Sequence, residues 1–207
     1  MQNVLYETSR IKNFIDAIFS IALTILILEI SLPRINDPTI TSLGSILYER
    51  QPQFIGYIVS FWVIALFWLS HVRNFRYARS IDHKLIMINL INLFFVVLLP
   101  FSTGLYVNNF GNATAFSWYS INIAILGLIS AWMIRYIYNS ELNNGELTKP
   151  RMIWYTLNGL NVFVIWALSA ALSDVYPWIA RGLFIMIFIN ESLLTRYWSK
   201  RVLDTNR

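Results

Sequence analysis

Six stretches of this chain are long and apolar enough to cross a bilayer as helices, and this pattern limits the possible folds more than any other. A bilayer core requires about 20 mostly apolar helical residues. Segments rich in Pro, Gly, Asn and charged residues separate the stretches, as expected of turns between helices. We predict an all-α integral membrane protein, a single domain over residues 1–207, with six transmembrane helices at about 14–32, 54–72, 85–105, 116–134, 152–172 and 175–194.

The composition agrees with a membrane protein and argues against several kinds of function. Hydrophobic residues make up 57% of the chain and charged residues only 13%, whereas about 25% of the residues in soluble domains are charged. The chain contains no cysteine, which excludes disulfides, thiolate metal sites and cysteine nucleophiles. It also contains no phosphate-binding glycine loop, zinc-binding helix motif or nucleophile elbow. We therefore predict that the protein is not an enzyme and needs no cofactor.

Lys and Arg are distributed unevenly among the segments that connect the spans. When the six spans alternate across the membrane, all but Arg34, Arg50 and Arg181 of the 16 basic residues fall on one side. Basic segments stay in the cytoplasm, so we expect a plasma-membrane protein with both termini cytoplasmic. Topology then explains the net charge of +5, and we expect no nucleic-acid partner. The start of the chain lacks a signal-peptide pattern, so the first span should be retained.

Polar side chains recur at one depth, near the cytoplasmic ends of the first three spans. Such groups are expensive inside a bilayer and often functional. Mutual contacts would satisfy them, which lipid cannot, so we favour a network joining the three spans over simple placement at the interface. A metal site would need a further ligand at suitable spacing, and none is present. The residues of this set are Asp16 in the first span, Trp68, Ser70 and His71 in the second, and Asp82, His83, Asn89 and Asn92 at the start of the third.

The first span also carries an apolar stripe. Ile21, Ile25 and Leu28 recur at helical spacing, with Thr24 beside them. At about 100° per residue, this stripe lies roughly 140° around the helix from Asp16. From the residues alone, such a stripe faces lipid or the protein core. Glu29, one turn after Ile25, is placed either at the mouth of a cation pathway or simply at the interface.

The first three spans resemble the TMEM175 family of potassium-permeable channels, in particular its short prokaryotic members. The opening of the first span, Arg10, Phe14 and Asp16 followed by Thr24, Leu26 and Glu29, matches the family pattern, except that Ile15 stands where the family has Ser. The later matches are Trp68, His71, Phe75, Asp82, Leu85, Asn89, Asn92, Pro100 and Phe101. Beyond the third span the resemblance is limited to hydropathy.

The resemblance implies a homotetrameric potassium channel in which the first helix lines the pore. Bulky aliphatic side chains would form the constriction in place of a carbonyl filter, in keeping with the absence of a TVGYG loop. Carried over, Ile21 would be the main constriction, with Thr24, Ile25 and Leu28 nearby, and K⁺ would be the permeant ion. Arg10, Phe14, Asp16 and His71 would brace the pore helix against its neighbours.

Two other functions remain open at this point. A proton-coupled secondary transporter would use Asp16 and His71 as a relay, although the chain shows no inverted repeat of the kind many transporters have. A membrane enzyme or assembly factor ranks last, because no set of catalytic residues converges. Both alternatives, like the channel, place the protein in the lipid bilayer.

Overall fold

The computed structural model describes residues 8–29, 44, 48 and 50–204. The described chain is helical, and its only β feature is an isolated bridge between Ala78 and Asn143. The expected all-α class is confirmed. In order, the elements are α1 (Thr8–Ile25), η1 (Leu26–Glu29, a 3₁₀ turn), α3 (Gln51–Arg76), α4 (His83–Asn108), α5 (Ala113–Asn139), α6 (Lys149–Leu172), α7 (Pro177–Gly182) and α8 (Ile185–Asp204).

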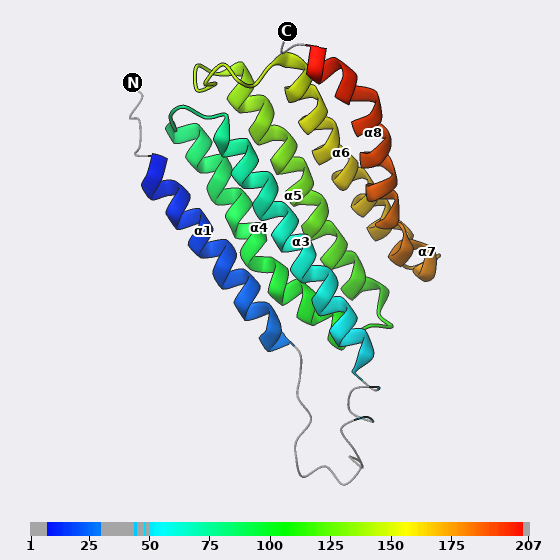
Figure 1. Cartoon of the computed structure of the whole chain (residues 1–207). Helices are drawn as coiled ribbons and strands as arrows, with labels where there is room; N and C mark the ends of the chain where they lie inside the picture. The colour runs from blue at the N-terminus through cyan, green and yellow to red at the C-terminus, as the bar shows by residue number, and fades with distance from the viewer. Residues whose placement is uncertain (1–7, 30–43, 45–47, 49, 205–207) are drawn as a thin grey trace.

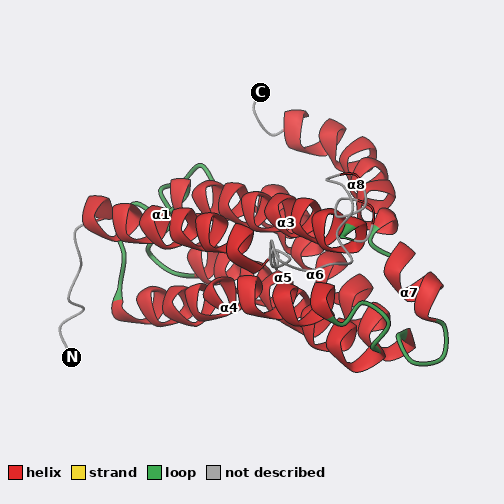
Figure 2. Ribbon diagram, turned by 90° about the horizontal axis from the view of Figure 1, so that it is seen from below, coloured by secondary structure: helices red, strands yellow, loops and turns green. Residues whose placement is uncertain are grey.

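The helices form a bundle in which neighbours in sequence are mostly neighbours in space (Figure 1). α1 packs on α3 and α4, α4 packs on α5, α5 packs along α6, and α6 carries α8. The same order appears from below, with α1 at one side of the bundle and α7 and α8 at the other (Figure 2). The start of α1 and the end of α8 lie at the same end of the bundle (Figure 1).

Five helices are long and apolar enough to span a membrane, judged over the described residues. Polar side chains cap the start of two of them, α4 and α5. Asp82 accepts a hydrogen bond from the Leu85 amide at 2.8 Å, and Asn112 accepts one from the Ala115 amide at 3.1 Å. The last residues of the first expected span, 30–32, lie outside the described part of the chain.

The sixth expected span, 175–194, is not one continuous helix. It contains the short α7, a turn at Leu183 and Phe184, and the first half of α8. Gly182 ends α7, and glycine is a poor helix former. Apolar content alone did not reveal this break, because hydropathy does not register a local change in backbone direction.

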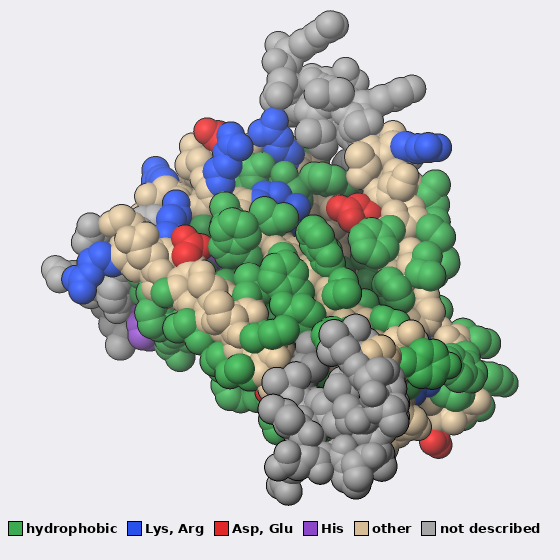
Figure 3. All heavy atoms as spheres, turned by 60° about the horizontal axis from the view of Figure 1, so that its bottom comes forward, with side chains coloured by type: hydrophobic (Ala, Val, Ile, Leu, Met, Phe, Trp, Pro, Cys, Tyr) green, Lys and Arg blue, Asp and Glu red, His purple; other side chains and the backbone are tan. Residues whose placement is uncertain are grey.

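The surface carries the pattern expected of a membrane protein. Hydrophobic side chains cover the middle of the face seen in Figure 3, and most of the visible Lys and Arg side chains gather towards one end. At the end of the bundle where α3 meets α4 and α5 meets α6, two connecting loops are joined through backbone bonds. The Arg79 amide donates to Leu142 O at 2.8 Å, and the Asn144 amide donates to Tyr77 O at 2.9 Å.

Candidate functional site: the two faces of α1

α1 has one buried face and one open face. Ile15, Phe19, Ala22 and Leu26 recur at helical spacing and are almost fully buried against the rest of the bundle. The opposite stripe is open: Ile21 is 55% exposed, Ile25 43% and Leu28 76%. A single chain therefore uses only one side of its first helix for packing and leaves a row of branched aliphatic side chains uncovered.

The 3₁₀ turn η1 changes the direction of the last side chains of this element. Leu28 of this turn is exposed, like Ile25 at the end of α1. Glu29 is turned away from that row. Its carboxylate packs against Gly104 of α4, where an added methyl group would overlap it, and its carbonyl accepts a long hydrogen bond of 3.5 Å from Asn108 Nδ2.

Thr24 belongs to the open stripe and is exposed. Its hydroxyl donates to the Ile21 carbonyl at 2.9 Å, one turn back along the same helix. The backbone therefore satisfies this hydroxyl without a neighbouring helix, and the open stripe remains predominantly apolar.

A hydrogen bond connects the middle of α1 to α3. Trp68 Nε1 donates to Asp16 Oδ1 at 2.8 Å, across 52 positions of sequence. Both side chains lie near the surface of the single chain, as do Arg10 and Phe14. Thus Asp16 and Trp68 meet as a pair, whereas Arg10 and Phe14 lie on the exposed side of the same helix.

His71 lies deeper, behind α1, and is only 5% exposed. Its Nε2 forms a 2.7 Å hydrogen bond with Asn89 Oδ1 of α4. Phe75 stacks on the imidazole with ring centroids 4.4 Å apart, and Phe19 of α1 lies at 5.9 Å from it. The imidazole therefore joins α3 to α4 by a hydrogen bond and contacts α1 through an aromatic ring.

Asp82 does not fit the single network expected from the sequence. One carboxylate oxygen caps α4 at the Leu85 amide, and the other accepts a short hydrogen bond from Tyr136 of α5. Its two bonds thus secure the start of α4 against α5, because it precedes α4 by one residue and points along that helix. The expected set is therefore three separate arrangements: Asp16 with Trp68, His71 with Asn89, and Asp82 with Tyr136.

Other polar contacts in the core were not anticipated. Ser60 of α3 bonds to the Tyr119 hydroxyl of α5 at 3.1 Å and accepts from Thr103 of α4 at 2.9 Å. Asn122 donates to Ser102 at 3.0 Å. Small hydroxyl side chains in membrane helices commonly bond across helices, but the sequence gives no sign of which ones meet. Phe19, which covers His71, was also missed, although it belongs to the buried stripe of α1.

The described residues contain no group of three or more His, Cys, Asp or Glu side chains that could hold a metal ion. His71 and His83 are therefore not assembled into a metal centre in this part of the chain. Asp16 and His71 also have different hydrogen-bond partners, Trp68 and Asn89.

Comparisons with known proteins agree with the resemblance in the first three helices. A family model described as "Endosomal/lysosomal potassium channel TMEM175" matches residues 10–100. A potassium channel of Streptomyces collinus is 35% identical over 99 residues, which cover 48% of this chain and 47% of that protein. A potassium channel of Chamaesiphon minutus is also 35% identical over 99 residues, covering 48% and 49%. The chain thus spans about half the length of the curated relatives it matches.

A solved structure extends the likeness of fold to nearly the whole chain. The crystal structure described as a lysosomal potassium-selective channel TMEM175 homolog from Chamaesiphon minutus superposes with a TM-score of 0.76. The match covers 94% of this chain and 97% of that one at 23% identity, so it concerns the fold alone. Residues 10–100 are thus similar in sequence to TMEM175 potassium channels, and nearly the whole chain shares the fold of one of them.

Proposed function

We propose that the chain assembles as a homotetramer that forms a potassium-permeable cation channel, with the open stripe of α1 lining a central pore. The observation that carries this proposal is the two-sided first helix: one face is buried in its own subunit and the other, with Ile21, Ile25 and Leu28, is uncovered. Exposure alone does not identify a pore-lining stripe, because lipid could cover an apolar stripe on any helix. The family match includes this helix, and the two relatives described above are named potassium channels.

In this proposal Ile21 forms the main constriction, and Thr24, Ile25 and Leu28 continue the wall. A ring of branched aliphatic side chains leaves a narrow apolar gap that closes by dewetting. Permeation then requires an ion to shed part of its hydration. K⁺ holds water less tightly than Na⁺, so K⁺ passes more easily, and the absence of fixed carbonyl ligands makes the selectivity modest.

The two hydrogen-bonded pairs behind α1 supply its support in this scheme. Trp68 holds Asp16 from α3, and the His71–Asn89 pair presents a rigid aromatic surface to Phe19. Both contact α1 near its middle, so they would fix its position while leaving the pore-facing side chains free. Arg10 and Phe14, exposed in the first half of α1, are proposed to complete the bracing through a neighbouring subunit.

We also propose that the basic end of the bundle faces the cytoplasm of the cell and that the channel is in the plasma membrane. The start of α1, the α3–α4 and α5–α6 loops and the end of α8 all lie at this end. These segments hold most of the Lys and Arg of the chain. Because basic segments of membrane proteins stay in the cytoplasm, this end would be the cytoplasmic one.

An ion-flux assay in liposomes tests the constriction. Ile21→Asn should raise total flux and bring K⁺ and Na⁺ fluxes towards equality, because a wetted ring no longer requires dehydration. A loss of about 1.4 kcal/mol in the free-energy difference between K⁺ and Na⁺ permeation corresponds to a tenfold drop in the K⁺ to Na⁺ flux ratio. Ile21→Val should retain wild-type selectivity, since it keeps the ring apolar.

Leu128→Asn provides the matched control, because Leu128 is a similarly exposed apolar residue on α5, away from α1. It should leave the K⁺ to Na⁺ ratio unchanged. If Ile21→Asn and Leu128→Asn have the same ratio as the wild type, Ile21 is not at the constriction. If purified wild-type protein gives no cation flux at all, the channel proposal itself fails.

A further inference from the structure

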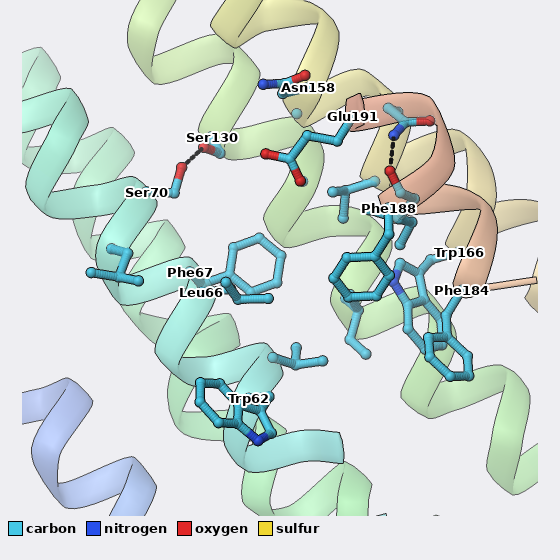
Figure 4. Close-up of a pocket in the computed structure, with 18 of the residues that line it drawn as sticks. Trp62, Leu66, Phe67, Ser70, Ser130, Asn158, Trp166, Phe184, Phe188 and Glu191 are labelled. Atoms are coloured by element: carbon cyan, nitrogen blue, oxygen red, sulfur yellow. Dashed lines mark hydrogen bonds between the residues drawn. The ribbon is translucent and has the colours of Figure 1, made fainter. Parts of the chain in front are cut away.

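A pocket of about 460 Å³ lies between α3 on one side and α8 on the other, with α5 and α6 at its back (Figure 4). This volume is within the range of about 300–1,000 Å³ typical of small-molecule sites. The pocket is on the side of α3 away from the Trp68–Asp16 and His71–Asn89 pairs. Ile58, Trp62, Leu66 and Phe188 at its rim are all about half exposed or more, so it opens on the apolar outer surface of the subunit.

The pocket has an apolar part and a polar part. Trp62, Leu66, Phe67, Trp166, Phe184 and Phe188 line the apolar part. The polar part is about two turns further along α3, at Ser70 and Arg73, and includes Asn158 and Glu191 from α6 and α8. The basic end of the bundle lies in this direction, so the polar part is nearer to that end than the apolar part is.

The polar part contains a neutral acceptor without a partner and a carboxylate. Ser70 is bonded to Ser130 at 3.2 Å and accepts from Arg73 Nη2 at 3.0 Å, so these groups satisfy one another. In contrast, Asn158 Oδ1 is buried without a hydrogen-bond partner among the described residues. The Glu191 carboxylate points into the pocket from α8, on the same side as Asn158 (Figure 4).

One donor is also unused, and it carries the opposite charge. Arg73 Nε is buried without a hydrogen-bond partner among the described residues, and its guanidinium interacts electrostatically with Glu191. A buried polar atom without a partner is costly to maintain. The polar part thus presents a negative group, a neutral acceptor and a positive donor, and it lies directly above an apolar slot.

We propose that this pocket binds a phospholipid whose head group contains a primary ammonium. The ammonium donates to Glu191 and Asn158 Oδ1, the phosphate lies beside Arg73, and one acyl chain occupies the apolar slot between Trp62 and Phe188. A primary ammonium has the N–H donors that Asn158 Oδ1 requires, whereas a quaternary trimethylammonium has none. The opening towards the bilayer favours a lipid over a water-soluble amine.

Lipid retention by the purified protein, measured by native mass spectrometry, tests the proposal. The protein is exchanged into detergent with phosphatidylethanolamine, phosphatidylcholine or phosphatidylglycerol of identical acyl chains. Wild type should retain phosphatidylethanolamine preferentially, by roughly threefold to tenfold, as expected for one or two net hydrogen bonds. Glu191→Gln and Asn158→Leu should each reduce this preference, and Leu66→Trp, which fills the slot, should reduce retention of all three lipids.

Glu141→Gln is the matched control, because Glu141 is an exposed acid in the α5–α6 loop outside the pocket. It should behave like wild type. Equal retention of phosphatidylethanolamine and phosphatidylcholine by wild type overturns the proposal, and so does a preference for phosphatidylglycerol, which would make Arg73 the only determinant. A long-chain alkylammonium that displaces phosphatidylethanolamine at equal concentration overturns the assignment to a phospholipid.

A neighbouring subunit is the remaining occupant to exclude. Since the chain has no cysteine, Leu66→Cys introduces a unique thiol at the rim of the pocket. Under oxidising conditions this variant should remain uncrosslinked if lipid fills the pocket. If the Leu66→Cys variant forms a disulfide-linked dimer, a second copy of the chain lies at the pocket, and the lipid assignment is overturned. None of these readouts depends on ion conduction.

Discussion

His71 and Asp16 show how burial determines the importance of a hydrogen bond. The imidazole is enclosed by Phe19 and Phe75 and has Asn89 as its partner at Nε2. Water cannot replace that partner, so losing it leaves a buried nitrogen unpaired. Asp16 and Trp68 have a bond of similar length, but both side chains are exposed in the single chain. At the residue scale, the His71–Asn89 bond therefore contributes more to stability.

Replacing Asn89 by Leu should lower the free energy of unfolding by about 1–3 kcal/mol, the range for a buried group left without a partner. Trp68→Phe, which removes the donor to Asp16, should have an effect nearer 0.5–1 kcal/mol. Thermal unfolding in a single detergent measures both. Asn139→Leu, at the exposed end of α5, is the control for the Asn-to-Leu change, and a loss there equal to that of Asn89→Leu would contradict the argument from burial.

At the scale of elements, α5 and α6 approach each other backbone to backbone where they cross. Gly127 and Gly159 face each other there. A Cβ added at Gly159 would lie 2.8 Å from the Gly127 carbonyl oxygen and 2.9 Å from the Ala131 amide nitrogen. These atoms belong to the backbone, so a rotamer change cannot relieve the overlap. Small residues allow such close approach of membrane helices.

Gly159→Ala should therefore push α5 and α6 apart and lower stability, by about 1–3 kcal/mol as found for overpacked cores. Gly111→Ala is the control, because an added Cβ at Gly111 meets no atom within 4 Å. Thermal unfolding measures the loss of stability, and the elution volume of the purified protein reports the separation of the two helices. Equal midpoints of thermal unfolding for Gly159→Ala and Gly111→Ala would show that α5 and α6 separate at little cost in free energy.

The sequence predicted the elements well where periodicity acts locally. Five long helices and the stripe of Ile21, Ile25 and Leu28 follow from the spacing of apolar residues, whereas the Asp82 and Asn112 caps and the buried stripe of α1 were not anticipated. The break at Leu183 and Phe184 was missed because the stretch stays apolar on both sides of it. The turn of Glu29 towards Gly104 was also missed, because it depends on a change from α to 3₁₀ geometry after Ile25.

The contacts of the candidate site were only partly predictable for a similar reason. The positions of polar residues along neighbouring spans can be read from the sequence, and two of the resulting pairs, Asp16 with Trp68 and His71 with Asn89, are in contact. Which side chains pair depends on helix rotation and packing, and these are properties of the assembled bundle. Asp82 therefore joined Tyr136 of α5, a residue that depth alone does not connect to it.

At the scale of the whole molecule, the proposed tetramer makes a geometric prediction. Side chains at a narrow central pore approach their counterparts in other subunits, whereas residues on the outer surface do not. The absence of native cysteine makes single substitutions informative. Ile21→Cys should form disulfide-linked dimers on oxidation in the membrane, as seen on a non-reducing gel. Leu168→Cys, on the exposed face of α6, should remain monomeric, and the reverse result would contradict a pore lined by α1.

The attachment of α1 to the bundle has a mechanical consequence. Trp68 bonds to Asp16 near the middle of α1, and Asn108 bonds to the backbone carbonyl of Glu29 at its far end. Between these two points the helix rests on its neighbours through the apolar side chains of Phe19, Ala22 and Leu26. A rod held at two points yields by bowing or rolling between them, and Ile21 lies in that stretch. Lateral force on this subunit therefore moves Ile21 more than it moves Asp16 or Glu29.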